Sequence, residues 1–241
     1  MHILSTRPDT GEIDPVAAGL AAAGHQVTSA PLMRVVHFGG LPTLDGVHAL
    51  IVTSRNGLKA VAPLSDAARA LPLYAVGPAT AALARELGVK HVVEGPGTAR
   101  ELLEIITRSA DKDAGPLLHI AGETLACDLA AALGTRGFTA RTETVYRTEP
   151  VDALPTKVAD AFRQNTFGGV VLMSPKTASV YSALVQGADL GSQALRMAHF
   201  CLSDAVAQKL ETLGAVRVAV ARLPNSQEML ALIAREASES S

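Results

Sequence analysis

Small polar residues and cations recur where the expected β-strands of this chain end. Short apolar stretches are followed by hydroxyl residues or glycines, and several of these turns also carry an arginine or a lysine. At the carboxyl edge of a parallel sheet, such turns expose the free N–H groups of the next helix, where an anion is favoured. The pattern predicts an edge that binds a ligand with several carboxylates or phosphates. Its candidate binding residues are Thr6, Arg7, Thr53, Ser54, Arg55, Gly77, Gly122, Ser174, Lys176, Thr177 and Ser203.

Each of these residues, taken singly, also has a purely structural interpretation. A serine or threonine before a helix is an ordinary N-cap that contributes about 1 kcal/mol of stability. The prediction of an anion-binding edge therefore depends on the whole pattern and not on any one member.

Tyr146 is the candidate catalytic residue. It is one of three tyrosines, and it ends a long β-type segment close to an expected crossing between domains. Its phenol can donate a hydrogen bond or a proton to a bound ligand. An interface tyrosine without a chemical role is an equally good interpretation of the residue alone.

Other familiar catalytic motifs are not found in the sequence. Gly95-Pro96-Gly97 is not a dinucleotide-binding fingerprint, because Arg100 occupies the place of its third glycine. The seven histidines show no metal-ligand spacing, and three of them fall in apolar strands. We expect neither a metal nor a cofactor. The three strand histidines are expected to be core residues with satisfied ring nitrogens; they are His2, His119 and His199.

The composition favours a globular protein of a reducing compartment. Hydrophobic residues make up 48% of the 241 residues and charged residues 18%, which is enough apolar material for a core and too little charge for disorder. The net charge of −2 disfavours a duplex nucleic-acid partner. Cys127 and Cys201 are expected as small buried residues and form no disulfide framework. No membrane span or export signal is recognised, so we expect a cytoplasmic protein, by default a monomer.

Strand and helix patterns alternate along the chain, which predicts an α/β fold with parallel sheets. Helix starts are marked by capping boxes at Thr98 with Glu101 and at Asn225 with Glu228. Helical spacing is seen, for example, over 79–87, 98–107, 125–133, 205–213 and 227–235. The expected strands are 2–6, 26–30, 49–54, 73–77, 91–94, 117–122, 139–146, 169–174, 199–203 and 216–221.

The chain also repeats itself in an order that predicts a discontinuous domain. Residues 49–55 resemble 170–176, residues 74–88 resemble 200–214, and the unit 3–32 resembles 119–146. We therefore expect residues 1–35 plus 150–241 to form one α/β domain and residues 38–144 to form an inserted one. Each would be a parallel β-sheet flanked by helices, and two crossings near 33–39 and 145–152 would join them, with a ligand cleft between. The alternative is two consecutive domains divided near 110–116.

Six motifs, in order over nearly the whole chain, resemble those of uroporphyrinogen-III synthases. Each motif alone is weak, but six in register at a matching length are fairly specific. The motifs are Thr6-Arg7-Pro8, Pro31-Leu32, Thr53-Ser54-Arg55-Asn56-Gly57, Ala75-Val76-Gly77-Pro78-Ala79-Thr80, Val145-Tyr146-Arg147-Thr148 and Ser174-Pro175-Lys176-Thr177.

This resemblance implies a cofactor-independent lyase of porphyrin and haem biosynthesis. Its substrate would be hydroxymethylbilane, a linear tetrapyrrole with eight carboxylates, which is closed into uroporphyrinogen III with inversion of the last pyrrole ring. The family's tyrosine maps onto Tyr146, and its hydroxyl-bearing turns map onto Thr53, Ser54, Ser174 and Thr177. One turn departs from the family, because Ser203-Asp204 stands where a Gly-Pro-Thr-Thr-like sequence is common.

Two other functional classes remain open on the residues alone. A non-catalytic two-domain binding protein for an anionic small molecule would use the same edges, and a sensor that kept the fold without the activity would fit the departure at Asp204. A nucleotide-dependent enzyme is disfavoured because the phosphate-binding loops are missing.

Overall fold

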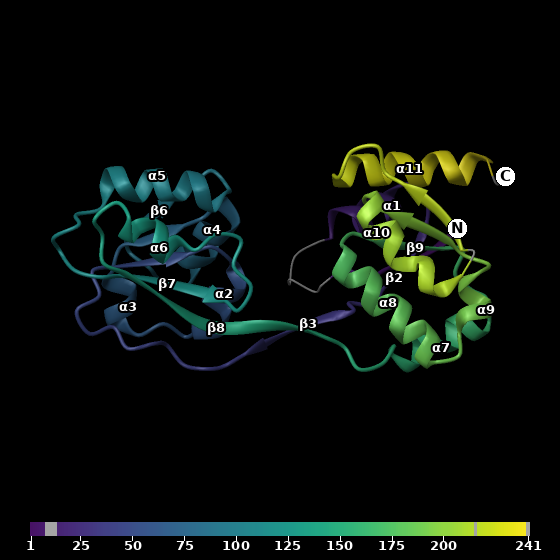
Figure 1. Ribbon diagram of the computed structural model, residues 1–241, viewed down its shortest axis with the longest axis horizontal. Helices are drawn as coiled ribbons and strands as arrows, with labels where there is room; N and C mark the ends of the chain where they lie inside the picture. The colour runs from purple at the N-terminus through teal and green to yellow at the C-terminus, as the bar shows by residue number, and fades with distance from the viewer. Residues whose placement is uncertain (8–13, 215, 240–241) are drawn as a thin grey trace. The chain divides into compact units, whose positions relative to one another are not determined.

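The computed structural model describes residues 1–7, 14–214 and 216–239. The chain separates into two compact units (Figure 1). Unit 1 comprises Met1–Arg34 and Glu149–Ser241, and unit 2 comprises Val35–Thr148. Pro8, the last residue of the first family-like motif, lies outside the described residues. Among the described residues, no helix is long and apolar enough to cross a membrane.

Unit 1 contains a five-stranded parallel sheet in the order β11-β10-β9-β1-β2. The N-terminal strand β1 lies inside this sheet, between β2 and β9, so segments from both ends of the chain complete one layer. The strands are β1 (His2–Ser5), β2 (Gln26–Ser29), β9 (Gly169–Leu172), β10 (Ala198–Cys201) and β11 (Arg217–Val220).

Helices cover both faces of this sheet and form two cores. Because side chains alternate along a strand, the neighbours Ile3 and Leu4 of β1 belong to opposite cores. Ile3 packs with α1 and α11, which lie side by side (Figure 1), and Leu4 packs with α7, α8 and the segment 206–213. The helices are α1 (Pro15–Ala22), α7 (Thr156–Arg163), α8 (Pro175–Gly187), α9 (Gly191–Ala194), α10 (Asp204–Ala207) and α11 (Ser226–Glu239).

Unit 2 contains a six-stranded sheet in the order β3-β8-β7-β4-β5-β6. The pairs from β8 to β6 are parallel, and strands β4, β5 and β7 are buried along their whole length. The strands are β3 (Met33–His37), β4 (Ala49–Val52), β5 (Leu73–Ala75), β6 (Val92–Glu94), β7 (Leu117–Gly122) and β8 (Ala140–Pro150).

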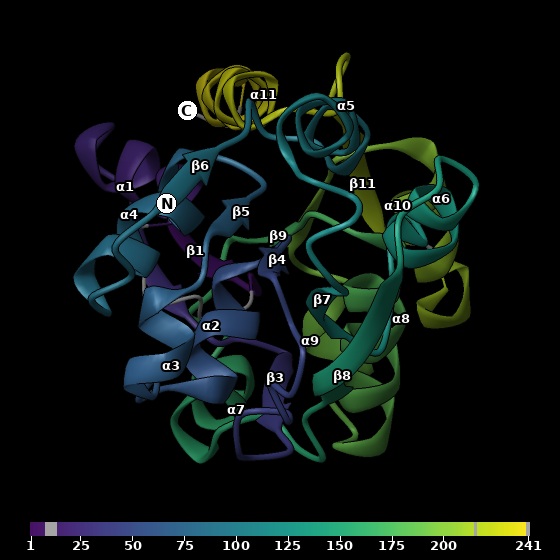
Figure 2. The ribbon, with the colours of Figure 1, turned by 90° about the vertical axis from the view of Figure 1, so that its left-hand side faces the viewer.

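The helices of unit 2 again cover two faces. Helices α2, α3 and α4 pack on one core and α5 and α6 on the other, and Figure 2 shows the two sets on opposite sides of the strands. Their bounds are α2 (Arg55–Val61), α3 (Asp66–Ala70), α4 (Pro78–Glu86), α5 (Ala99–Ser109) and α6 (Leu129–Gly134). The prediction of an α/β fold with parallel sheets flanked by helices is confirmed.

Three local predictions were wrong. Strand β3 was not among the expected strands. Only Met33 of its five residues is buried, so its apolar pattern is weak, and the strand forms by pairing with β8. The helix expected over 125–133 begins only at Leu129, because the side chain of Asp128 caps it there. The helix expected over 205–213 is a short α10 followed by a 3₁₀ helix, Gln208–Leu213.

Both expected capping boxes place the N-cap side chain correctly. The N–H of Glu101 donates to the hydroxyl of Thr98 over 3.3 Å, and the N–H of Glu228 donates to Oδ1 of Asn225 over 2.9 Å. These bonds satisfy donors that a helix start otherwise leaves unpaired.

The position of β1 inside the unit 1 sheet leads to a stability prediction. Replacing the fully buried Leu4 by alanine leaves a cavity, which costs about 2–5 kcal/mol of unfolding free energy. Amide hydrogen exchange should therefore accelerate in the strands of unit 1 and stay nearly unchanged in unit 2. The control Val218→Ala, at a side chain that is 39% exposed on β11, should cost about 1 kcal/mol or less. An equal loss of protection in both units would contradict the division into units.

Candidate active site

A pocket of about 390 Å³ lies at the carboxyl edge of the unit 2 sheet. It brings together four predicted site residues that are far apart in sequence: Thr53, Ser54, Gly122 and Tyr146. Strand β4 delivers the first two, β7 delivers the glycine and β8 delivers the tyrosine. This arrangement agrees with the general rule that ligands bind past the carboxyl ends of parallel strands.

The turn after β4 holds Ser54 as the N-cap of α2. Its hydroxyl accepts the N–H of Asn56 over 3.0 Å, and the cap backbone is extended. On the other side of the pocket, Thr98 caps α5 and donates its hydroxyl hydrogen to Oε2 of Glu101 over 2.6 Å. Both hydroxyls thus do the structural work of caps while they line the pocket.

Tyr146 is placed by an irregularity in the pairing of β7 and β8. Ala121 pairs with Thr144, but Gly122 pairs with Tyr146, so Val145 is the extra residue of a β-bulge. Val145 is buried in the core, while the tyrosine ring lies directly over the glycine. A Cβ atom at position 122 would lie only 2.5 Å from Cζ and 2.8 Å from the hydroxyl of Tyr146. Gly122 is therefore needed for the position of the ring.

His119 also lines this pocket, and sequence reasoning assigned it only to the core. Its Nε2 lies 3.1 Å from the hydroxyl of Thr53, and its Nδ1 lies 3.3 Å from the hydroxyl of Thr142. Both ring nitrogens have partners, as expected. Burial lowers the pKa of His119 to about 4, and the negative charge of Asp128 only partly opposes this shift. The ring is therefore neutral near pH 7.

The other two strand histidines each use Nε2 to contact a hydroxyl group. His199 is buried and its Nε2 lies 3.1 Å from the hydroxyl of Tyr181, while Nε2 of His2 lies 2.8 Å from that of Thr28. Nδ1 of His2 lacks a side-chain or backbone hydrogen-bond partner among the described residues. The ring of His199, in contrast, also interacts with the backbone of Met197 and of Arg217, which partly opposes the lowering of its pKa by burial. The prediction of fully satisfied ring nitrogens was wrong for His2.

A second pocket, of about 370 Å³, lies at the carboxyl edge of the unit 1 sheet. Four further predicted residues line it: Thr6, Arg7, Ser174 and Thr177. Ser174 caps the 13-residue helix α8, accepting the N–H of Thr177 over 3.1 Å and donating its own hydroxyl hydrogen to Oγ1 of Thr177 over 2.9 Å. This pocket thus contains a well-formed helix N-terminus, the kind of site that favours anions.

Thr6 and Arg7 are tied to the surrounding structure of this second pocket. The buried hydroxyl of Thr6 donates to the carbonyl oxygen of Val171 over 2.8 Å, so it links β1 to β9. Nε of Arg7 lies 3.4 Å from Oδ1 of Asp14, and about a third of the arginine side chain, 32%, is exposed. Thr6 therefore acts first as a structural residue, and Arg7 retains an exposed cationic face.

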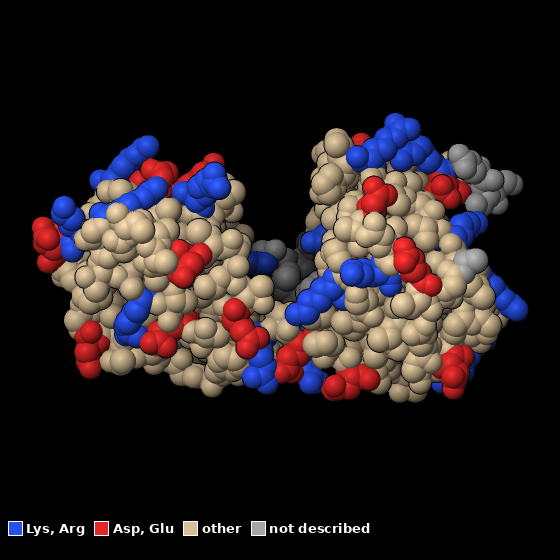
Figure 3. Space-filling view, in the orientation of Figure 1, with Lys and Arg blue, Asp and Glu red and all other residues tan. Residues whose placement is uncertain are grey.

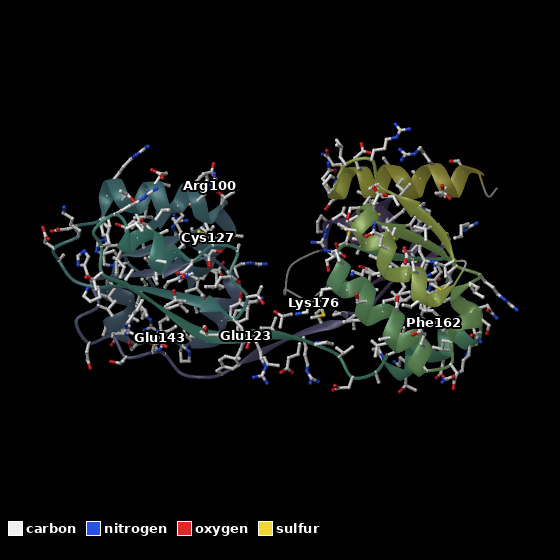
Figure 4. All side chains as sticks on the ribbon, viewed as in Figure 1. Arg100, Glu123, Cys127, Glu143, Phe162 and Lys176 are labelled. Atoms are coloured by element: carbon white, nitrogen blue, oxygen red, sulfur yellow. The ribbon has the colours of Figure 1, made fainter. Side chains whose placement is uncertain are left out.

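Four predicted residues lie outside the linings of these two pockets: Arg55, Gly77, Lys176 and Ser203. Lys176 lies in the first turn of α8 (Figure 4), beside the serine cap of the second pocket. Gly77 caps α4 and supports the first pocket from behind, since a Cβ there would lie 3.1 Å from Cα of Gly97 in its wall. Their roles in binding stay predictions, as does the expected cleft between the two domains.

Neither sign of charge dominates the face of the molecule that Figure 3 shows. Figure 3 shows lysine, arginine and acidic side chains mixed over the visible face of each unit. Among the residues that the structure describes, no group of three or more His, Cys, Asp or Glu residues could hold a metal ion.

The fold and the pockets define a class: a two-unit α/β protein whose parallel sheets end in anion-favouring turns. Comparison with known proteins assigns the chain to a family. The family model described as uroporphyrinogen-III synthase HemD matches residues 14–231. The chain belongs to the uroporphyrinogen-III synthase family, and it is an enzyme of porphyrin and haem biosynthesis.

A solved structure of low sequence identity shares this fold. The uroporphyrinogen-III synthetase of Helicobacter pylori is 14% identical, with a TM-score of 0.63 over 98% of this chain and 99% of that one. A mutant uroporphyrinogen III synthase of Thermus thermophilus is 16% identical, with a TM-score of 0.49 over 99% of both chains. At such identities the first of these similarities establishes the fold alone.

The buried neutral state of His119 predicts a pH dependence of stability. Its pKa is about 4 when folded and near 6.5 when unfolded, so between these values only the unfolded chain binds the proton. The unfolding free energy is therefore not reduced by this group above pH 6.5. It falls as the pH is lowered from 6.5 towards 4, because protonation then favours the unfolded chain. His199, whose pKa is also lowered to about 4, contributes in the same direction.

Urea unfolding at pH 7 and pH 5 measures this effect. In His119→Asn the loss of unfolding free energy between the two pH values should be smaller than in the unmodified chain by ~1–2 kcal/mol. His37→Asn, at an exposed histidine, is the control and should leave the loss unchanged. An identical loss in all three proteins would show that His119 is not buried as described.

Proposed function

We propose that this chain is a lyase that closes hydroxymethylbilane into uroporphyrinogen III with inversion of the terminal pyrrole ring. The observation that carries the proposal is the meeting, in one pocket, of Tyr146 with Thr53 and Ser54, which all lie on motifs that resemble the family. We further propose that the enzyme is cytoplasmic, acts as a monomer and uses neither a metal nor a cofactor.

The reaction removes one water molecule and forms one ring. Departure of the terminal hydroxyl, assisted by a proton, leaves an electrophilic azafulvene at the first pyrrole. Attack by the substituted carbon of the last pyrrole gives a spiro intermediate, which fragments and closes again with that ring inverted. Closure at the free carbon, which happens without an enzyme, gives the type I isomer instead.

The enzyme must therefore direct geometry more than supply reactive groups. In this proposal the substrate carboxylates are held by helix N–H groups and hydroxyls, with Ser174 at the start of α8 and Thr53 and Ser54 after β4. Tyr146 donates the proton that leaves with the hydroxyl. The absence of a nucleophile–base pair from the sequence motifs is consistent with such a role.

Isomer analysis tests the function directly. Hydroxymethylbilane is generated in situ, incubated with the purified chain, and the products are oxidised to porphyrins and separated as types I and III. We expect a large excess of type III. Type I alone, formed at the spontaneous rate, would exclude the synthase activity under those conditions and favour a non-catalytic binding or sensor protein.

The proton-donor role predicts the behaviour of Tyr146→Phe. The phenylalanine keeps the ring that packs over Gly122 but loses the hydroxyl, so kcat should fall by about 10²–10⁴-fold with folding intact. Tyr74→Phe is the matched control, because its buried hydroxyl bonds to Ser109 and does not line the pocket. Initial rates and circular dichroism of both variants give the comparison. A kcat that is unchanged in Tyr146→Phe would remove this residue from the chemistry.

A further inference from the structure

A buried imidazole connects three strands beneath the pocket of unit 2. His119 lies in β7, which pairs with β4 on one side and β8 on the other. Its ring bridges two threonine hydroxyls, that of Thr53 just past β4 at 3.1 Å and that of Thr142 in β8 at 3.3 Å. Only 1% of the histidine is exposed. The three groups form one continuous hydrogen-bonded row that ends at the pocket.

This row has two possible directions, and they give Thr53 opposite properties. A neutral imidazole carries one donor and one acceptor nitrogen. If the hydroxyl of Thr142 donates to Nδ1, then Nε2–H donates to the oxygen of Thr53, whose own hydrogen is free to donate into the pocket. If the row is reversed, the hydroxyl of Thr53 donates its hydrogen to Nε2. Its oxygen can then only accept a hydrogen bond from a ligand in the pocket.

Burial keeps the imidazole neutral, with a single N–H donor. Burial disfavours the imidazolium and brings the pKa of His119 to about 4; Asp128, at the N-cap of α6, opposes this effect without reversing it. The carboxylate of Glu143, the neighbour of Thr142, is held by Arg141. The other ionisable groups in the pocket wall are Cys127 and Tyr146. The direction of the hydrogen bonds in the row therefore depends on what the hydroxyls of Thr53 and Thr142, at its two ends, donate to or accept from.

We propose that His119 is a positioning residue which, with Thr142, turns the hydroxyl hydrogen of Thr53 into the pocket so that it donates to a carboxylate of the substrate. This inference rests on the proposed function, because a polycarboxylate accepts hydrogen bonds and selects the first direction. Thr142 does not line the pocket, so it acts on the substrate only through the imidazole.

The position of Thr142 behind the imidazole allows a selective test. In Thr142→Val the donor to Nδ1 is lost and Thr53 is no longer oriented, so KM should rise about ten-fold with kcat within about two-fold. Thr142→Ser retains the hydroxyl and should restore KM to within about two-fold of the unmodified enzyme. Thr144→Val is the matched control, an exposed threonine two residues further along β8, and should leave KM unchanged.

A second measurement reads the direction of the row without turnover. Nitrogen-15 NMR of the labelled histidine ring distinguishes the two tautomers, and uroporphyrin III, the oxidised form of the proposed product, serves as the octacarboxylate probe. We expect the Nε2–H tautomer in the complex of the unmodified chain, a loss of its predominance in Thr142→Val, and weaker probe binding by that variant.

The outcomes separate the inference from the proposed function. An unchanged KM in Thr142→Val, an equal rise in the valine, serine and control variants, or an Nδ1–H tautomer in the complex would each overturn the positioning role. If the unmodified chain forms no type III isomer, the proposed function fails. Probe binding and the tautomer then decide whether the row still orients Thr53 toward a carboxylate.

Discussion

The structure depends on one constraint: parallel strands buried on both faces can carry their polar chemistry only at their ends. Strands β4, β7, β9 and β10 are buried along their whole length, so few polar side chains within them can reach a ligand directly. The hydroxyls, glycines and cations are accordingly found in the turns that follow, where helices begin. Both pockets are consequences of this arrangement, one on each unit.

The same constraint explains why the buried histidines His119 and His199 have different partners. A polar ring inside such a strand must find partners, since leaving it unpaired costs about 1–3 kcal/mol. In unit 1 His199 finds Tyr181, which is itself fully buried, so that bond serves the core alone. In unit 2 His119 finds Thr53, which lines a pocket. Only the second pairing can transmit the orientation of a buried group to a ligand.

Much of the fold could be predicted because alternating strand and helix patterns have local causes. The capped helix starts at Thr98 and Asn225 could be predicted for the same reason. Strand β3 could not, because it is formed by its pairing with β8 and not by a strong apolar pattern of its own. The place of Tyr146 over Gly122 depends on a bulge between two paired strands, and a register is not visible in either strand alone. His119 was predicted to be a core residue because a histidine in an apolar strand gives the same sequence pattern whether or not it lines a pocket.

The departure at Ser203-Asp204 has a structural meaning in this chain. Asp204 lies in the first turn of α10, where a carboxylate interacts favourably with the helix dipole, and the side chain of Ser203 makes no cap bond among the described residues. The helix end is therefore already supplied with a negative charge, and α10 spans only Asp204–Ala207. In the proposed function, the substrate carboxylates bound by unit 1 are therefore assigned to the longer helix α8, whose first turn combines the cap of Ser174 with the charge of Lys176.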